Sequence, residues 1–83
     1  MFIKLKLGSY TIHHGYDENN VQITEEVKIE GYSEKIVKLD RILSIAENTI
    51  LIASDYDRVI YWKYEGDFSI IHARLKNSGF LIE

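Results

Sequence analysis

The sequence predicts an α+β, β-rich fold: a small, mostly antiparallel sheet of five or six strands, with one C-terminal α-helix packed on a face. Three observations lead to this prediction. Several runs alternate apolar and polar residues with the period of two that is typical of half-buried strands. β-branched and aromatic residues crowd two apolar runs within residues 49–64, which indicates a central hairpin. Helical spacing is clear only after Gly66.

The chain has 83 residues, and we expect a single domain over residues 1–83. It contains no cysteine, which excludes disulfides, a thiolate nucleophile and a cysteine-based zinc site. Its longest apolar runs are four residues long, far below the ~20 residues of a membrane helix. The N-terminus lacks the pattern of a signal peptide. These features predict a cytoplasmic protein that is not attached to a membrane.

The N-terminal residues predict two short strands. Residues 2–7 alternate strictly between apolar and lysine side chains. Residues 10–16 follow, with Tyr10 and Ile12 on one face. Gly8-Ser9 separates the two runs, and glycine at the first position of a two-residue loop favours a type II′ hairpin. We therefore expect an antiparallel pair joined by a tight turn at these two residues.

A longer strand is expected over residues 21–30, after turn-forming residues at 17–20. Its apolar residues recur at every second position and so share one face of the strand, and Glu25 occupies one of the positions on that face. Three interpretations fit this carboxylate: the strand runs off the core, a bulge shifts its register, or the group is functional. We expect a long bent strand that is broken near Glu25 and ends at Gly31.

Three further strands and one helix complete the prediction. Residues 35–46 fit both a helix and a strand, and we prefer a strand because β-branched residues open the segment and no clear cap closes it. Residues 50–54 and 59–64 form the central hairpin, joined by a polar connector. The helix is expected near residues 67–77, with Asp67 as its N-cap.

The core is expected to form from the apolar face of the strands and the apolar stripe of the helix. The residues expected to be buried are Ile3, Leu5, Leu7, Ile12, Leu43, Ile52, Ile60, Phe68, Ile71 and Leu75. A chain this short builds one limited core. We therefore expect the protein to self-associate as a homo-oligomer, because that would bury further apolar surface.

Histidine and aspartate residues are the candidates for catalytic or metal-binding sites. Imidazole binds metals and acts as a base near neutral pH, but His13 and His14 are neighbours on a strand and point to opposite faces. A small histidine-dependent enzyme would need His14 together with His72 or an acidic residue. Asp55 and Asp57 form a fragment seen in divalent-metal sites, which turn chemistry explains equally. We expect no catalytic residue, no metal site and no cofactor.

The net charge of −3 hides an uneven distribution. Residues 17–34 hold six acidic residues against one lysine, whereas residues 1–16 hold two lysines and no acidic residue. Such a segment is either a solvated strand face that resists edge pairing or an acidic surface that meets a basic partner. We place Glu26 and Glu30 on one strand parity, as a charged ridge. The candidate binding residues of this segment are Tyr16, Glu18, Glu26, Glu30, Tyr32 and Glu34.

Aromatic residues provide the other candidates for binding, since the chain holds six tyrosines and one tryptophan. Tyr61 and Trp62 are adjacent on a strand, so one of them must face away from the core. Tyrosine and tryptophan are common in binding hot spots, although a small sheet also uses them in its core. We include Tyr61 and Trp62 among the candidate binding residues.

Charge, size and surface chemistry predict a small non-enzymatic protein-binding or inhibitory module, of the kind expected of phage or mobile-element accessory proteins. Its partner would be a protein with a basic surface. The alternative is a nucleic-acid-binding regulatory domain, although the net negative charge makes nucleic acid a poor partner. That alternative would use the basic residues Lys4, Lys6, Lys35, Lys38 and Arg41. A small histidine-dependent enzyme is the third candidate.

Overall fold

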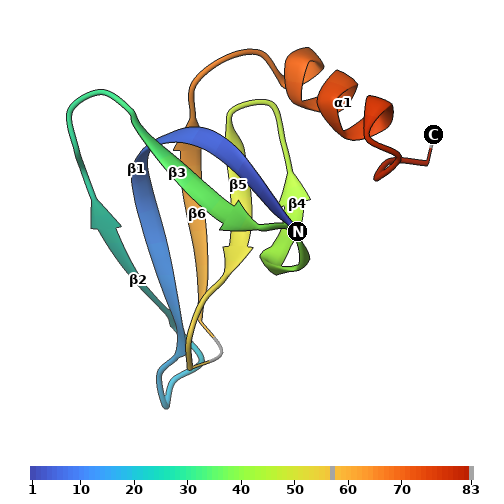
Figure 1. Ribbon diagram of the computed structural model, residues 1–83. Coiled ribbons are helices and arrows are strands. Elements are labelled where there is room, and N and C mark those ends of the chain that lie inside the picture. The colour runs from blue at the N-terminus through green and yellow to red at the C-terminus, as the bar shows by residue number, and fades with distance from the viewer. Residues whose placement is uncertain (57, 83) are drawn as a thin grey trace.

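The computed structural model, which describes residues 1–56 and 58–82, contains a six-stranded antiparallel sheet and a C-terminal helix (Figure 1). The elements are β1 (Phe2–Tyr16), β2 (Gln22–Val27), β3 (Ser33–Lys38), a 3-10 helix (Leu39–Arg41), β4 (Ile42–Ile45), β5 (Thr49–Ala53), β6 (Val59–Tyr64) and α1 (Phe68–Asn77). The predicted α+β fold class is confirmed.

The long strand β1 organises the sheet. The strand order is β2-β1-β6-β5-β4, and β3 also pairs with β1. On one side, β1 pairs with β6; on the other, its C-terminal half pairs with β2 and its N-terminal half with β3. Figure 1 shows β1 bending along its length. The bend brings Met1 close to the 3-10 helix, where the Leu39 amide donates to the Met1 carbonyl oxygen at 3.0 Å.

The predicted hairpin at Gly8-Ser9 is wrong, because β1 runs through both residues without reversing. The pairing of β1 with β6 shifts register between Leu7 and Tyr10. This bulge explains the sequence pattern, since the apolar residues occupy odd positions up to Leu7 and even positions from Tyr10. One extra residue keeps both sets on the same face, so the change of parity does not require a turn.

The strand expected over residues 21–30 is shorter than predicted. β2 ends at Val27 and β3 starts at Ser33, so the break lies at residues 28–32 and not near Glu25. Gly31 adopts a φ of +67°, a left-handed conformation that ends regular pairing. Glu25 is exposed, which supports the interpretation that the strand runs off the core at this point.

The remaining element types are confirmed. The segment 35–46 is strand at residues 35–38 and 42–45, and the 3-10 helix between them contains Arg41, which did not fit a continuous strand pattern. β5 and β6 pair as the predicted central hairpin, from Thr49 opposite Lys63 to Ala53 opposite Val59. α1 begins after Asp67, although the Asp67 side chain makes no capping hydrogen bond.

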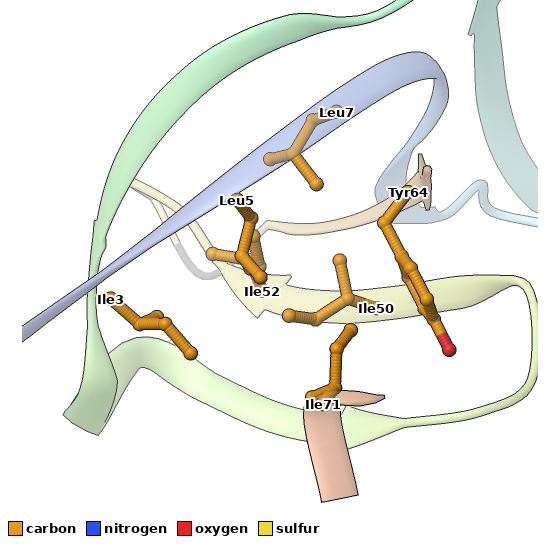
Figure 2. Close-up of a cluster of buried hydrophobic side chains, with 7 residues drawn as sticks. All are labelled: Ile3, Leu5, Leu7, Ile50, Ile52, Tyr64 and Ile71. Atoms are coloured by element: carbon orange, nitrogen blue, oxygen red, sulfur yellow. The ribbon is translucent and has the colours of Figure 1, made fainter. Parts of the chain in front are cut away.

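Seven side chains form the buried core that Figure 2 shows. They are Ile3, Leu5, Leu7, Ile50, Ile52, Tyr64 and Ile71. Of the predicted core residues, Ile12, Ile60 and Leu75 are only half-buried, and the prediction is wrong for Leu43 and Phe68, which are 56% and 40% exposed. Leu43 lies on the terminal strand β4, and Phe68 begins α1, where neither residue reaches the enclosed side of the sheet.

α1 joins the core through Ile71, which points toward Ile50 in Figure 2. Ile71 is 4% exposed, whereas its neighbour Ile70 is 57% exposed. The Arg74 guanidinium adds a hydrogen bond of 3.2 Å to the Lys4 carbonyl oxygen. Ile71 is the buried residue of the helix, and the half-buried Leu75 packs against the same core.

We predict that Ile71→Ala lowers the free energy of unfolding by about 2 to 4 kcal/mol, because it leaves a cavity between helix and sheet. Ile70→Ala is the matched control and should cost less than about 1 kcal/mol. Urea denaturation measures both values. Equally small losses for the two variants would show that α1 does not depend on Ile71 for docking.

Tyr64 is the polar member of the core. Its side chain is 4% exposed, and its hydroxyl donates to the carbonyl oxygens of Ala46 and Glu47, the latter at 2.9 Å. Burial raises the pKa of the Tyr64 hydroxyl, and the carboxylates of Glu47 and Asp67 add to the effect. The neutral hydroxyl thus links β6 to the turn between β4 and β5.

The raised pKa of Tyr64 predicts a loss of stability in alkali. The contribution is complete below the unfolded pKa of about 10 and is lost as the pH rises through the higher folded pKa. The free energy of unfolding, measured with urea over this alkaline range, should therefore fall more steeply with pH for the natural chain than for Tyr64→Phe. Parallel declines would contradict the assignment, because the other titrating groups are common to both proteins.

Candidate functional site

The candidate site is one edge of the sheet, formed by residues 17–34. This segment includes β2, the break at residues 28–32 and the start of β3, all on the same side of β1. Every residue in it is exposed except Val27, which is half-buried. We call this segment, together with the exposed Tyr16 that precedes it, the acidic edge.

The carboxylates of the acidic edge differ in their contacts. Glu25 lies 3.2 Å from His14 Nε2, and Glu34 lies 3.9 Å from the Lys4 ammonium. Glu18, Glu26 and Glu30 form no ion pair within residues 1–56 and 58–82. These three exposed carboxylates are available to a partner.

The predicted ridge of Glu26 and Glu30 on one strand parity is wrong. Glu26 lies on β2 opposite Thr11, whereas Glu30 lies in the irregular segment that follows β2. The left-handed Gly31 and the hydrogen bonds of Ser9 explain the break: the Ser9 hydroxyl accepts from the Ile29 amide at 3.0 Å and donates to the Ile29 carbonyl oxygen at 3.2 Å. The two carboxylates still share the same edge.

The same edge exposes apolar side chains. The exposed fractions are 67% for Tyr16, 58% for Val21, 44% for Ile23, 40% for Ile29 and 47% for Tyr32. Sequence reasoning missed Val21, Ile23 and Ile29, because their period of two indicated burial. Glu25 on the same parity was the available signal, since a carboxylate on an apolar face indicates that water reaches that face.

Gly8 fixes the position of Tyr32. A Cβ at residue 8 would lie 2.9 Å from the Cε1 atom of Tyr32 and 3.1 Å from the Gly31 carbonyl oxygen. The tyrosine ring therefore packs directly over the glycine backbone, at the point where β1 bulges. The position of the Tyr32 ring on the acidic edge therefore depends on residue 8 having no side chain.

A groove of about 300 Å³ lies beside the acidic edge, on the outer face of the sheet. Glu26 and Lys28 line it from the edge, and Tyr61 and Lys63 line it from β6. The Tyr61 ring also lies 4.8 Å from the His13 ring. The fold therefore brings Glu26 and Tyr61 together, although they are far apart in the sequence.

Trp62 lies on the opposite face from Tyr61, as their adjacency predicted. It is half-buried against the core, its ring 4.0 Å from that of Tyr10 and 5.2 Å from the Lys35 ammonium. Trp62 is therefore separated from the groove and from the acidic edge.

The acidic edge carries Tyr16 and Glu18 near one end and Tyr32 and Glu34 near the other.

The histidines are distributed over separate surroundings. His14 contacts Glu25, whereas His13 bonds the Gln22 amide on the outer face. The His72 ring stacks with that of Phe68 on α1. In the described residues, no three His, Cys, Asp or Glu side chains gather where they could hold a metal ion. Asp57 of the connector lies outside the described residues.

The basic residues of the nucleic-acid alternative are largely engaged. Lys4, Lys38 and Arg41 each have a carboxylate within 4.0 Å, from Glu34, Asp40 and Asp55 respectively. The Lys35 ammonium lies over the Trp62 ring. Exposed ion pairs of this kind are weak, but they lower the local positive potential. The five cations therefore do not form an uninterrupted phosphate-binding face.

Searches of protein-family models, curated proteins and solved structures found no match to this chain. Within residues 1–56 and 58–82, no helix has the length and apolar character needed to cross a membrane.

We predict an energetic coupling between Gly8 and Tyr32. Gly8→Ala should cost about 1 to 2 kcal/mol, because the new methyl group displaces the Tyr32 ring. In the Tyr32→Ala background the same change should cost less by at least about 0.5 kcal/mol. Urea unfolding of the four proteins of the cycle measures the coupling, and strictly additive costs would contradict the observed packing.

Proposed function

We propose that the protein is a non-enzymatic binding or inhibitory module whose acidic edge contacts a basic surface on a protein partner. The observation that supports this most directly is the mixture of unpaired carboxylates and exposed apolar side chains on residues 16–32. A face that only maintained solubility would not need Val21, Ile23 and Ile29 in contact with water. The carboxylates can attract a positively charged surface, and the apolar side chains can provide contact area that becomes buried on binding.

The two kinds of side chain would act at different stages of binding. Glu18, Glu26 and Glu30 would attract a positively charged surface and raise the association rate. Tyr32, held over Gly8, and the neighbouring Ile29 would then bury apolar area and slow dissociation. Tyr61 would extend the contact into the adjacent groove.

Other functions have less support from the described residues. Four of the five cations of the nucleic-acid alternative, Lys4, Lys35, Lys38 and Arg41, are engaged by carboxylates or by Trp62. The histidines of the enzyme alternative are dispersed. We also propose a cytoplasmic location, which the lack of cysteine supports. The further proposal of an accessory role in a phage or mobile element rests on composition alone.

Charge reversal at Glu26 and Glu30 tests the proposal. The immobilised natural chain should capture a basic protein from a host lysate, identified by mass spectrometry. With that partner purified, Glu26→Lys/Glu30→Lys should slow association about tenfold or more at low ionic strength and flatten its salt dependence. Stability should hardly change, because both residues are exposed.

The matched control is Glu47→Lys/Glu65→Lys, which makes the same change in net charge at exposed positions outside the acidic edge. This control should retain most of the association rate. Equal effects of the two double variants would indicate a response to net charge alone. An unchanged rate for the edge variant would exclude the acidic edge as the contact surface.

A further inference from the structure

The folded chain has more surface than a compact protein of its mass. Its accessible surface is 6183 Å², compared with about 5,100 Å² expected for a folded monomer of this size. Its radius of gyration is 13.9 Å, compared with about 12 Å expected. The excess of about 1,000 Å² is close to the ~800 Å² that each partner buries in a standard protein interface. The shape therefore provides enough surface for a stable interface with a second molecule.

The terminal strand β4 leaves one edge without a partner strand among the described residues. It pairs with β5 on one side and is the last strand in the sheet order. Its residues Ile42–Ile45 carry no charge. At the other end of the sheet, β2 carries Glu25 and Glu26, and charged side chains on an edge strand discourage pairing with another chain. β4 carries no such charges. Its pairing with β5 shifts register between Ile42 and Ser44, and the extra residue there, Leu43, is 56% exposed.

An apolar groove of about 530 Å³ lies next to β4. Ile42 and Ile45 line it from β4, Leu75 lines it from α1 and Phe80 from the segment after α1. Met1, Leu39 and Asp40 complete the lining. Phe80 is 49% exposed, so the groove is open to a partner. An uncharged strand edge without a partner strand and an apolar groove are therefore adjacent.

We propose that two copies of this chain associate by antiparallel pairing of their β4 strands, with apolar side chains of each copy entering the groove of the other. Such an interface is two-fold symmetric, so the same uncharged surface meets itself. β2 and β4 lie at opposite ends of the sheet order, which keeps the acidic edges of the two copies away from the interface. The dimer would present two acidic edges, but its formation does not depend on their function.

Sedimentation velocity of the full chain tests the proposal. At micromolar to tens of micromolar concentrations the natural chain should sediment with twice its mass of 9.7 kDa. Leu43→Lys should shift the equilibrium toward monomer by about tenfold or more, because it places a charge on the pairing edge. Ile23→Lys, at an exposed apolar position on the other edge strand, is the matched control and should remain dimeric.

A natural chain that stays monomeric over this range would overturn the proposal. It would also be overturned if Leu43→Lys remained dimeric, or if Ile23→Lys alone became monomeric, since the interface would then lie elsewhere. Circular dichroism should confirm that each variant is folded before its mass is interpreted.

The absence of cysteine provides a second test that does not depend on Leu43→Lys folding. Single cysteines are introduced as Leu43→Cys and Ser44→Cys, and oxidation is followed for each variant and for their equimolar mixture. At least one of these samples should form disulfide-linked dimers about tenfold faster than the Thr24→Cys control on β2. Equal rates for all samples would overturn the pairing of β4.

Discussion

The bulge in β1 between Leu7 and Tyr10 is the constraint on which the rest of the sheet depends. Apolar side chains occupy odd positions before it and even positions after it, and the extra residue keeps both sets on the enclosed face. Because β1 continues through the bulge, it can pair with β6 on one side and with β2 and β3 in succession on the other. Without this continuity β2 and β3 would have no common neighbour.

The same bulge positions the candidate site. Ser9 replaces regular strand pairing with two hydrogen bonds to Ile29, and Gly8 leaves room for the Tyr32 ring. The irregular segment between β2 and β3 is therefore fixed to β1 although it is not a strand. Binding residues on such a segment can be displayed at low entropic cost, since the fold already restricts their positions.

The two ends of the sheet differ in chemistry, and this difference separates the two proposed interfaces. β2 carries carboxylates that resist pairing with another strand but attract a basic surface. β4 carries no charge and borders an apolar groove. Among the described residues the buried core has seven side chains, so much apolar surface remains outside it. The chain therefore has both an edge suited to a charged partner and one suited to a second copy of itself.

The sequence by itself determined the element types and much of the core. Period-two alternation predicted strands at Ile3, Leu5 and Leu7, the apolar runs around Thr49–Tyr64 predicted the central hairpin, and helical spacing predicted α1. These features are local, because each depends on side chains within one segment. The acidic character and most residues of the candidate edge were also visible in the sequence.

Only the tertiary structure decided which surfaces the elements cover. A change of parity at Gly8-Ser9 is compatible with a turn or a bulge, and the pairing of β1 with β6 selects the bulge. Period two in β2 indicates two distinct faces, but whether the apolar face is buried depends on what lies across from it, so Val21 and Ile23 remain exposed. Glu26 and Tyr61 line the same groove because of the order of the strands in the sheet. Periodicity within a single segment does not specify that order.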